Sequence, residues 1–153
     1  MAFLGDRLGI VTYNPGDLRD RWRRDQQCLS RTLSKVIRIF AGKGADVICI
    51  QDFAVHEIGI PELLDVFTPL AESLDMKFHM DKGYIALTKK RLRMESSLHR
   101  VFPDGTLDSK TWGKRHWRTV QLLSCEDKQL GVVNVHCPVG QDRVRVLQTY
   151  HDH

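Results

Sequence analysis

Three polar side chains, each placed just after an apolar run, are the residues of this sequence that could do chemistry together. Asn14 follows "GIVTY", Asp52 follows "VICIQ" and His136 follows "VVNV". In open α/β sheets, ligands bind outside the carboxyl ends of the strands. Taken singly, Asn14 before a proline is ordinary turn chemistry, Asp52 could cap a turn, and His136 could be a satisfied structural histidine. Their shared position after three predicted strands favours one ligand-binding or catalytic site.

Hydrophobic periodicity predicts the elements that must position these residues. The sequence predicts strands at 8–13 and 47–50, a helix from Asp17 to about Ala41 that ends at Gly42 and Gly44, and a second helix from Pro61. Further strands are predicted from Lys77 onward, in the stretches "KFHM", "YIALT", "SLHRVF", "WRTVQLLS" and "LGVVNVH". This order predicts an α/β fold with one mixed β-sheet and helices on one face.

Length and composition indicate one intracellular domain. The chain has 153 residues, and no apolar run approaches the roughly 20 residues that a membrane span needs. The first residues do not form a secretory signal. The four cysteines have no metal-ligand spacing, so we expect reduced, apolar side chains: Cys28, Cys49, Cys125 and Cys137.

Positive charge is concentrated in one part of the chain. Between Lys82 and Arg118 there are ten Lys and Arg against three acidic residues, a balance of +7 in a chain of net charge +4. Such a segment indicates either a surface that faces a polyanion or a solvated strand edge protected by lysines. Aromatic residues interleave with the charges in "KTWGKRHWR", a pattern that suits nucleic acid as well as a loop anchored on the core.

Four motifs in order resemble the endonuclease/exonuclease/phosphatase superfamily, which has the deoxyribonuclease-I-like fold. They are "VTYN", "ADVICIQD", "GYIALTKKRL" and "VVNVHCP", and together they extend over about residues 8–150. Arg118, at the start of "RTVQLLS", matches an arginine often found at that place. The resemblance implies half of a four-layer α/β sandwich, namely the N-terminal half of the family domain.

The resemblance also implies Mg²⁺- or Mn²⁺-dependent hydrolysis of phosphodiesters or phosphomonoesters, with nucleic acid among the candidate substrates. Asn14 would orient the phosphate or a metal-bound water, and Asp52 would bind the metal, which prefers hard oxygen ligands. His136 would act on the scissile phosphate as a clamp or proton donor, and Arg118 would bind a phosphate oxygen. Tyr84 is a further candidate for the substrate side, or for the core.

Two departures from the family pattern leave a second interpretation open. Asp52 stands where the family usually has glutamate, and Asn14 and Asn134 are the only asparagines, so the later Asp-x-Asn motif is absent. We therefore predict a single truncated domain over residues 1–153, in which one apolar sheet face needs a protein partner or a second copy to cover it. The alternative functions are an inactive scaffold, subunit or binding module, and a phosphate-backbone binder that uses the segment from Lys82 to Arg118.

Overall fold

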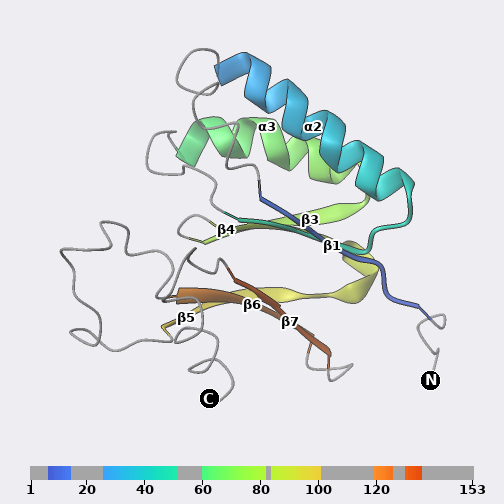
Figure 1. The fold of residues 1–153 in the computed structure, drawn as a ribbon, viewed down its shortest axis with the longest axis vertical. Helices are drawn as coiled ribbons and strands as arrows, with labels where there is room; N and C mark the ends of the chain where they lie inside the picture. The colour runs from blue at the N-terminus through green and yellow to red at the C-terminus, as the bar shows by residue number, and fades with distance from the viewer. Residues whose placement is uncertain are drawn as a thin grey trace, which may run out of the picture.

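The computed structural model describes residues 7–14, 26–51, 60–81, 84–100, 119–125 and 130–135. Along the chain these residues form two α-helices, seven strands and one short 3-10 helix. The elements are β1 (Ile10–Tyr13), α2 (Gln26–Gly42), β2 (Val47–Ile50), α3 (Ile60–Ser73), β3 (Met76–Asp81), β4 (Tyr84–Lys89), η2 (Lys90–Leu92), β5 (Glu95–Arg100), β6 (Thr119–Cys125) and β7 (Leu130–Asn134). They build three layers, with both helices on one face of a first sheet and a second sheet on its other face (Figure 1).

The four-stranded sheet has the order β1-β2-β4-β3 and is mixed. β1 and β2 are parallel, with Tyr13 opposite Ile50, whereas β4 runs antiparallel to both β2 and β3. Consequently β1, β2 and β3 all run in the same direction and end at the same side of the sheet. The predicted strands, the mixed character and the helices on one face are confirmed.

The prediction of one sheet is wrong, because β5, β6 and β7 form a separate antiparallel sheet. The chain leaves the first sheet through η2 and Arg93, whose φ of 51° lies in the left-handed region. Leu92 and Met94, on either side of Arg93, are fully buried between the two sheets. This corner turns the chain so that the second sheet packs over the face that the sequence predicted to be bare.

The core between the helices and the first sheet explains why the helices form where they do. α2 places Leu33 and Ile37 one turn apart, and α3 places Leu63 and Phe67 likewise. The Phe67 ring stacks on Phe78 of β3, with the ring centroids 5.7 Å apart. α2 ends as predicted, because Gly44 adopts a φ of 88° that favours glycine.

The layer between the two sheets is apolar at one end and polar at the other. Its apolar end contains Val47, Cys49, Ala86, Leu92, Met94, Leu123, Cys125 and Val132. Cys49 and Cys125 are free, buried thiols, as predicted for them, and burial raises the pKa of Cys49 to about 11. The polar end lies where β1, β2 and β7 finish. In the part of the chain described here, neither helix is long and apolar enough to cross a membrane.

Candidate functional site

Four strands from two sheets finish at one end of the molecule, which we call the carboxyl edge. Its members are the ends of β1, β2, β3 and β7, at Tyr13, Ile50, Asp81 and Asn134. Parallel pairing brings the first two ends together, and the Gln51 N–H donates to the Tyr13 carbonyl over 3.1 Å. The end of β7 joins them across the two sheets, since Gln51 Nε2 donates to Asn134 Oδ1 over 2.7 Å.

Three of the predicted site residues, Asn14, Asp52 and His136, come one or two residues after a strand end of this edge in the chain. Asn14 is exposed and follows the last residue of β1. Asp52 follows Gln51, and His136 comes two residues after Asn134. Asp52, His136 and Arg118 themselves lie outside the described residues, so their roles stay predictions. The structure thus brings together the three strand ends that precede Asn14, Asp52 and His136.

Gln51 and Asn134 are the centre of a buried hydrogen-bond network between the sheets. Gln51 is 6% exposed, and its Nε2 donates to Thr12 Oγ1 over 2.6 Å as well as to Asn134. Asn134 is 1% exposed, and its Nδ2 donates to the Ile85 carbonyl over 3.3 Å and to Gln121 Oε1 over 3.0 Å. These bonds join β1, β2 and β4 of one sheet to β6 and β7 of the other.

The network continues from Gln121 to an acidic side chain. Gln121 is fully buried, and its Nε2 donates to Asp81 Oδ2 and to Ser96 Oγ, each over 3.1 Å. Ser96 Oγ donates to the same Asp81 oxygen. Unpaired polar groups are costly to bury, and this network satisfies most of the groups that it takes out of water.

One atom of the network is the exception. Among the described residues, Gln51 Oε1 accepts no hydrogen bond, although its side chain is buried. This oxygen and the exposed Asn14 carboxamide are hard oxygen donors of the kind that Mg²⁺ prefers, and Asp52, the next residue in the sequence, lies outside the described ranges. The two described donors suit a divalent cation by their chemistry, although no three His, Cys, Asp or Glu side chains in the described ranges group closely enough to hold a metal.

Two other polar or aromatic candidates belong to the packing. His79 is buried, and its Nε2 lies 2.9 Å from Thr88 Oγ1. Burial, and then the Lys77 charge, lower the pKa of His79, so the imidazole is neutral near pH 7. Tyr84 is 1% exposed, which places it in the core.

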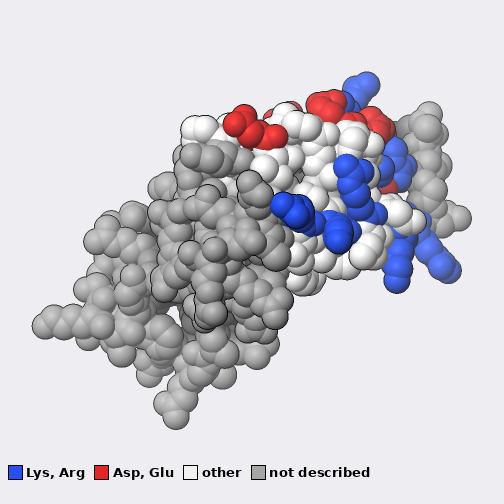
Figure 2. Space-filling model, turned by 90° about the horizontal axis from the view of Figure 1, so that it is seen from above, with Lys and Arg blue, Asp and Glu red and all other residues white. Residues whose placement is uncertain are grey.

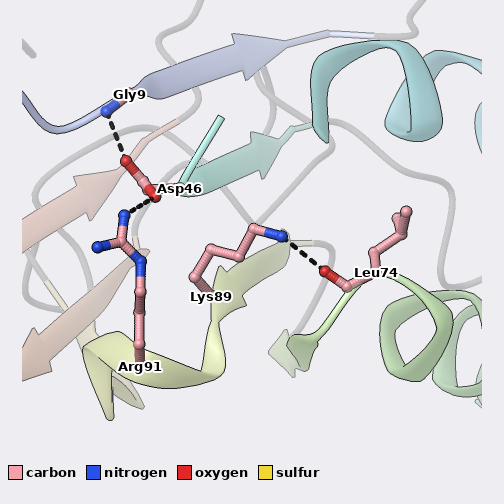
Figure 3. Close-up of polar contacts among 5 residues, drawn as sticks. All are labelled: Gly9, Asp46, Leu74, Lys89 and Arg91. Atoms are coloured by element: carbon pink, nitrogen blue, oxygen red, sulfur yellow. Dashed lines mark hydrogen bonds and ion pairs between the residues drawn. The ribbon is translucent and has the colours of Figure 1, made fainter. Parts of the chain in front are cut away.

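The described part of the basic segment makes contacts that stabilise the fold at the end of β2 opposite to the carboxyl edge (Figure 3). Arg91 Nη2 lies 2.5 Å from Asp46 Oδ1, and Lys89 Nζ donates to the Leu74 carbonyl over 2.7 Å. Lys90 pairs with Glu72 over 2.5 Å. These contacts support the solvated-edge interpretation for the stretch next to β4, while Trp112, Trp117 and the other residues of 101–118 lie outside the described ranges.

Charges of opposite sign are separated on the helix layer (Figure 2). α2 exposes Arg31, Lys35 and Arg38 at helical spacing and contains no acidic residue. α3 exposes Asp65 and Glu72 instead. The basic face of α2 therefore carries a positive local field.

Sequence reasoning missed the network, although part of its signal was present. Asn134 alternates with Val132 in β7, and the alternation of a strand places both side chains on the same, inward face. An amide at an inward position needs a partner, and Gln51 at the end of an apolar strand offers one. Nothing in the sequence showed that the two residues, 83 positions apart, would meet.

No family model matches this chain, and comparison with curated proteins and with solved structures gives no significant match either.

Proposed function

We propose that this chain is a relative of the endonuclease/exonuclease/phosphatase superfamily and that its carboxyl edge carries a Mg²⁺-dependent site for phosphate-ester hydrolysis. In this proposal the two sheets with their helices form one half of a deoxyribonuclease-I-like sandwich. One observation carries it: the Gln51–Asn134 hydrogen bond joins, across two sheets, the strand ends that precede Asp52 and His136. Asn14 leaves the neighbouring parallel strand at the same edge.

The roles follow from the chemistry of the side chains. Asp52 and Asn14 would hold the cation through oxygen atoms, and the bound ion would supply charge stabilisation for the phosphoryl oxygens. His136 would donate a proton to the leaving oxygen or clamp the phosphate, and Arg118 would bind a phosphate oxygen through its guanidinium. Water would form a bond to phosphorus as the P–O ester bond breaks. The departing oxygen would take a proton from His136, and the proton lost by the attacking water would pass to solvent, from which His136 is reprotonated.

The positive face of α2 supports a polyanionic substrate, of which nucleic acid is the first class to test. The exposed cations of this helix, Arg31, Lys35 and Arg38, recur at helical spacing and suit consecutive phosphates. Binding through such contacts falls steeply as the salt concentration rises, whereas hydrolysis of a small phosphodiester does not depend on them. Comparing a short single-stranded oligonucleotide with bis-p-nitrophenyl phosphate at two salt concentrations separates these contributions.

The first test is the melting temperature of the chain with and without saturating Mg²⁺. A cation at about 100 times its dissociation constant adds roughly 2.7 kcal/mol to the free energy of unfolding. For a domain of this size we expect an upward shift of about 5–10 °C. Asp52→Ala should abolish the shift, whereas Asp65→Ala, an exposed carboxylate on α3, should keep it.

Hydrolysis supplies the second readout. His136→Ala should lower the rate by about 10²- to 10⁴-fold and leave the Mg²⁺ shift intact, because the imidazole acts on the phosphate and not on the metal. A wild-type protein that neither shifts with Mg²⁺ nor hydrolyses either substrate would overturn the proposal.

That outcome would favour the second candidate, a non-catalytic module that binds a protein. Its supporting observation is the outward face of the three-stranded sheet, where Val133 is 57% exposed and lies opposite Leu122 in the ladder. Light scattering would then show whether a second copy covers this face, and a mass near that of the monomer would exclude self-association.

A further inference from the structure

The hydrogen bonds of the inter-sheet network have one direction, which an acidic side chain and a backbone carbonyl both favour. An ionised carboxylate only accepts hydrogen bonds, so Asp81 requires Gln121 to present Nε2. Gln121 Oε1 then faces Asn134, which must present Nδ2. Asn134 Oδ1 in turn faces Gln51, which must present its own Nε2. The Ile85 carbonyl, which only accepts, also requires Asn134 to present Nδ2, so Asp81 and this carbonyl impose the same orientation on the three amides.

The far end of this chain of amides is Gln51 Oε1, which accepts no hydrogen bond from any residue that the structure describes. Because both N–H groups of Gln51 are used by Thr12 and Asn134, the carboxamide directs only its oxygen toward other ligands. Hydrogen bonds aligned in series polarise one another, and the low dielectric of a buried site strengthens the effect. The charge on Asp81 thus makes Gln51 Oε1 a stronger acceptor than an isolated amide oxygen.

We propose that Asp81, Gln121, Asn134 and Gln51 form a polarised relay that presents Gln51 Oε1 to the water shell of a hydrated divalent cation at the carboxyl edge. The inference rests on the proposed function and extends it, because it assigns cation binding to Gln51 and a tuning role to Asp81. Mg²⁺ usually keeps several of its waters in protein sites, and such waters donate to nearby oxygen atoms. A buried acceptor without a partner is the group that such a water satisfies.

In this proposal Asp81 acts on the cation through the relay, which makes it a positioning residue. Asp81→Asn removes its charge but keeps its shape. The Ile85 carbonyl still accepts from Asn134 Nδ2, so the amides keep their orientation, but Gln51 Oε1 loses the polarisation that the Asp81 charge supplies. We expect the dissociation constant for Mg²⁺ to rise roughly 3- to 10-fold, the size of coupling found within one hydrogen-bond network.

Glu95→Gln is the matched control. Glu95 lies on β5, next to Ser96, and pairs across the two sheets with Lys77 over 2.8 Å. Its replacement removes one negative charge from the same region without touching the relay. We expect its Mg²⁺ dissociation constant to stay within about twofold of wild type, since exposed charges are strongly screened.

A direct readout of Gln51 needs neither catalysis nor a variant. Mn²⁺, added as a paramagnetic substitute for Mg²⁺, broadens the NMR signals of nuclei close to the ion. In wild-type protein we expect the side-chain amide signal of Gln51 to broaden at substoichiometric Mn²⁺, and that of Gln121, deeper in the relay, to broaden less. The Asp81→Asn variant should need a correspondingly higher Mn²⁺ concentration for the same broadening of the Gln51 signal. Its melting temperature without metal shows whether the variant is folded.

The outcomes separate this inference from the function on which it rests. If wild-type protein binds Mg²⁺ and Mn²⁺ but Asp81→Asn and Glu95→Gln bind them equally well, the relay is wrong and the proposed function stands. Equal broadening of the Gln51 and Gln121 signals would also overturn the relay. If wild-type protein binds neither cation, both proposals fail.

Discussion

Replacing Asn134 by leucine is expected to lower the free energy of unfolding by about 3 kcal/mol, and the melting temperature by about 6–12 °C. The two side chains are similar in size, so the effect does not come from a cavity. The substitution instead leaves three buried groups without their partner, namely Gln51 Nε2, Gln121 Oε1 and the Ile85 carbonyl. Each such group costs about 1–3 kcal/mol, partly offset by the added apolar burial. Urea unfolding measures the change.

Two variants check the cause. Val133 lies on the same strand but faces outward, so Val133→Ala should change the free energy of unfolding by less than about 0.5 kcal/mol. Adding Gln51→Met to Asn134→Leu removes one of the polar groups that Asn134→Leu leaves without a partner. The loss in free energy of unfolding of the double variant should therefore be smaller than the sum of the losses of the two single variants. Strict additivity would show that the Gln51–Asn134 bond contributes nothing of its own.

Local patterns were sufficient to predict the elements of this fold. The run "VICI" is β2, and the glycine that ends α2 adopts the left-handed conformation expected of it. β3 and β4 pair as an antiparallel ladder from Asp81 and Tyr84 onward, on either side of the place where a turn was predicted. Short-range sterics and hydrophobic periodicity decide such features, and both can be read from neighbouring residues.

The division into two sheets depends on a corner of the chain that no local sequence pattern predicts. The chain changes sheets at Arg93, a residue with a side chain that adopts a conformation usually taken by glycine. Burial of Leu92 and Met94 on either side stabilises this corner, and burial depends on the packed sheets. Strands of the same pattern would fit a single larger sheet equally well, which is what we predicted.

The candidate site could be predicted only as a set of strand ends. The parallel pairing of β1 and β2 brings Asn14 next to Gln51. The contact between Gln51 and Asn134 depends instead on how two sheets stack, and no pattern along one strand encodes that distance. Polar residues at inward positions identify which side chains need partners, while the packed structure decides which partners they find.

Asp46 lies at the other end of the first sheet. Its substitution should cause the second large loss of stability. Its Oδ2 accepts from the Gly9 N–H over 3.0 Å and its Oδ1 from Arg91 over 2.5 Å, which ties β1, β2 and η2 together (Figure 3). The carboxylate is 10% exposed. Asp46→Asn offers one oxygen to two donors, so we expect a loss of about 2 kcal/mol near pH 7. Lys90→Gln, which breaks only the exposed pair with Glu72, should change stability little.

The loss should depend on pH in a defined direction. Burial alone would raise the pKa of Asp46, but the hydrogen bonds from Gly9 and Arg91, with the charges of Arg91 and Lys89, hold it below the ordinary value of 3.8. Because the folded pKa is the lower one, the unfolded chain takes up the proton first as the pH falls. The stability difference between wild type and Asp46→Asn should therefore be complete above about pH 5 and shrink as the pH falls below 4. Urea unfolding at a series of pH values measures it, and a difference that persists undiminished to pH 2 would show that the contacts, and not the charge, carry the contribution of Asp46.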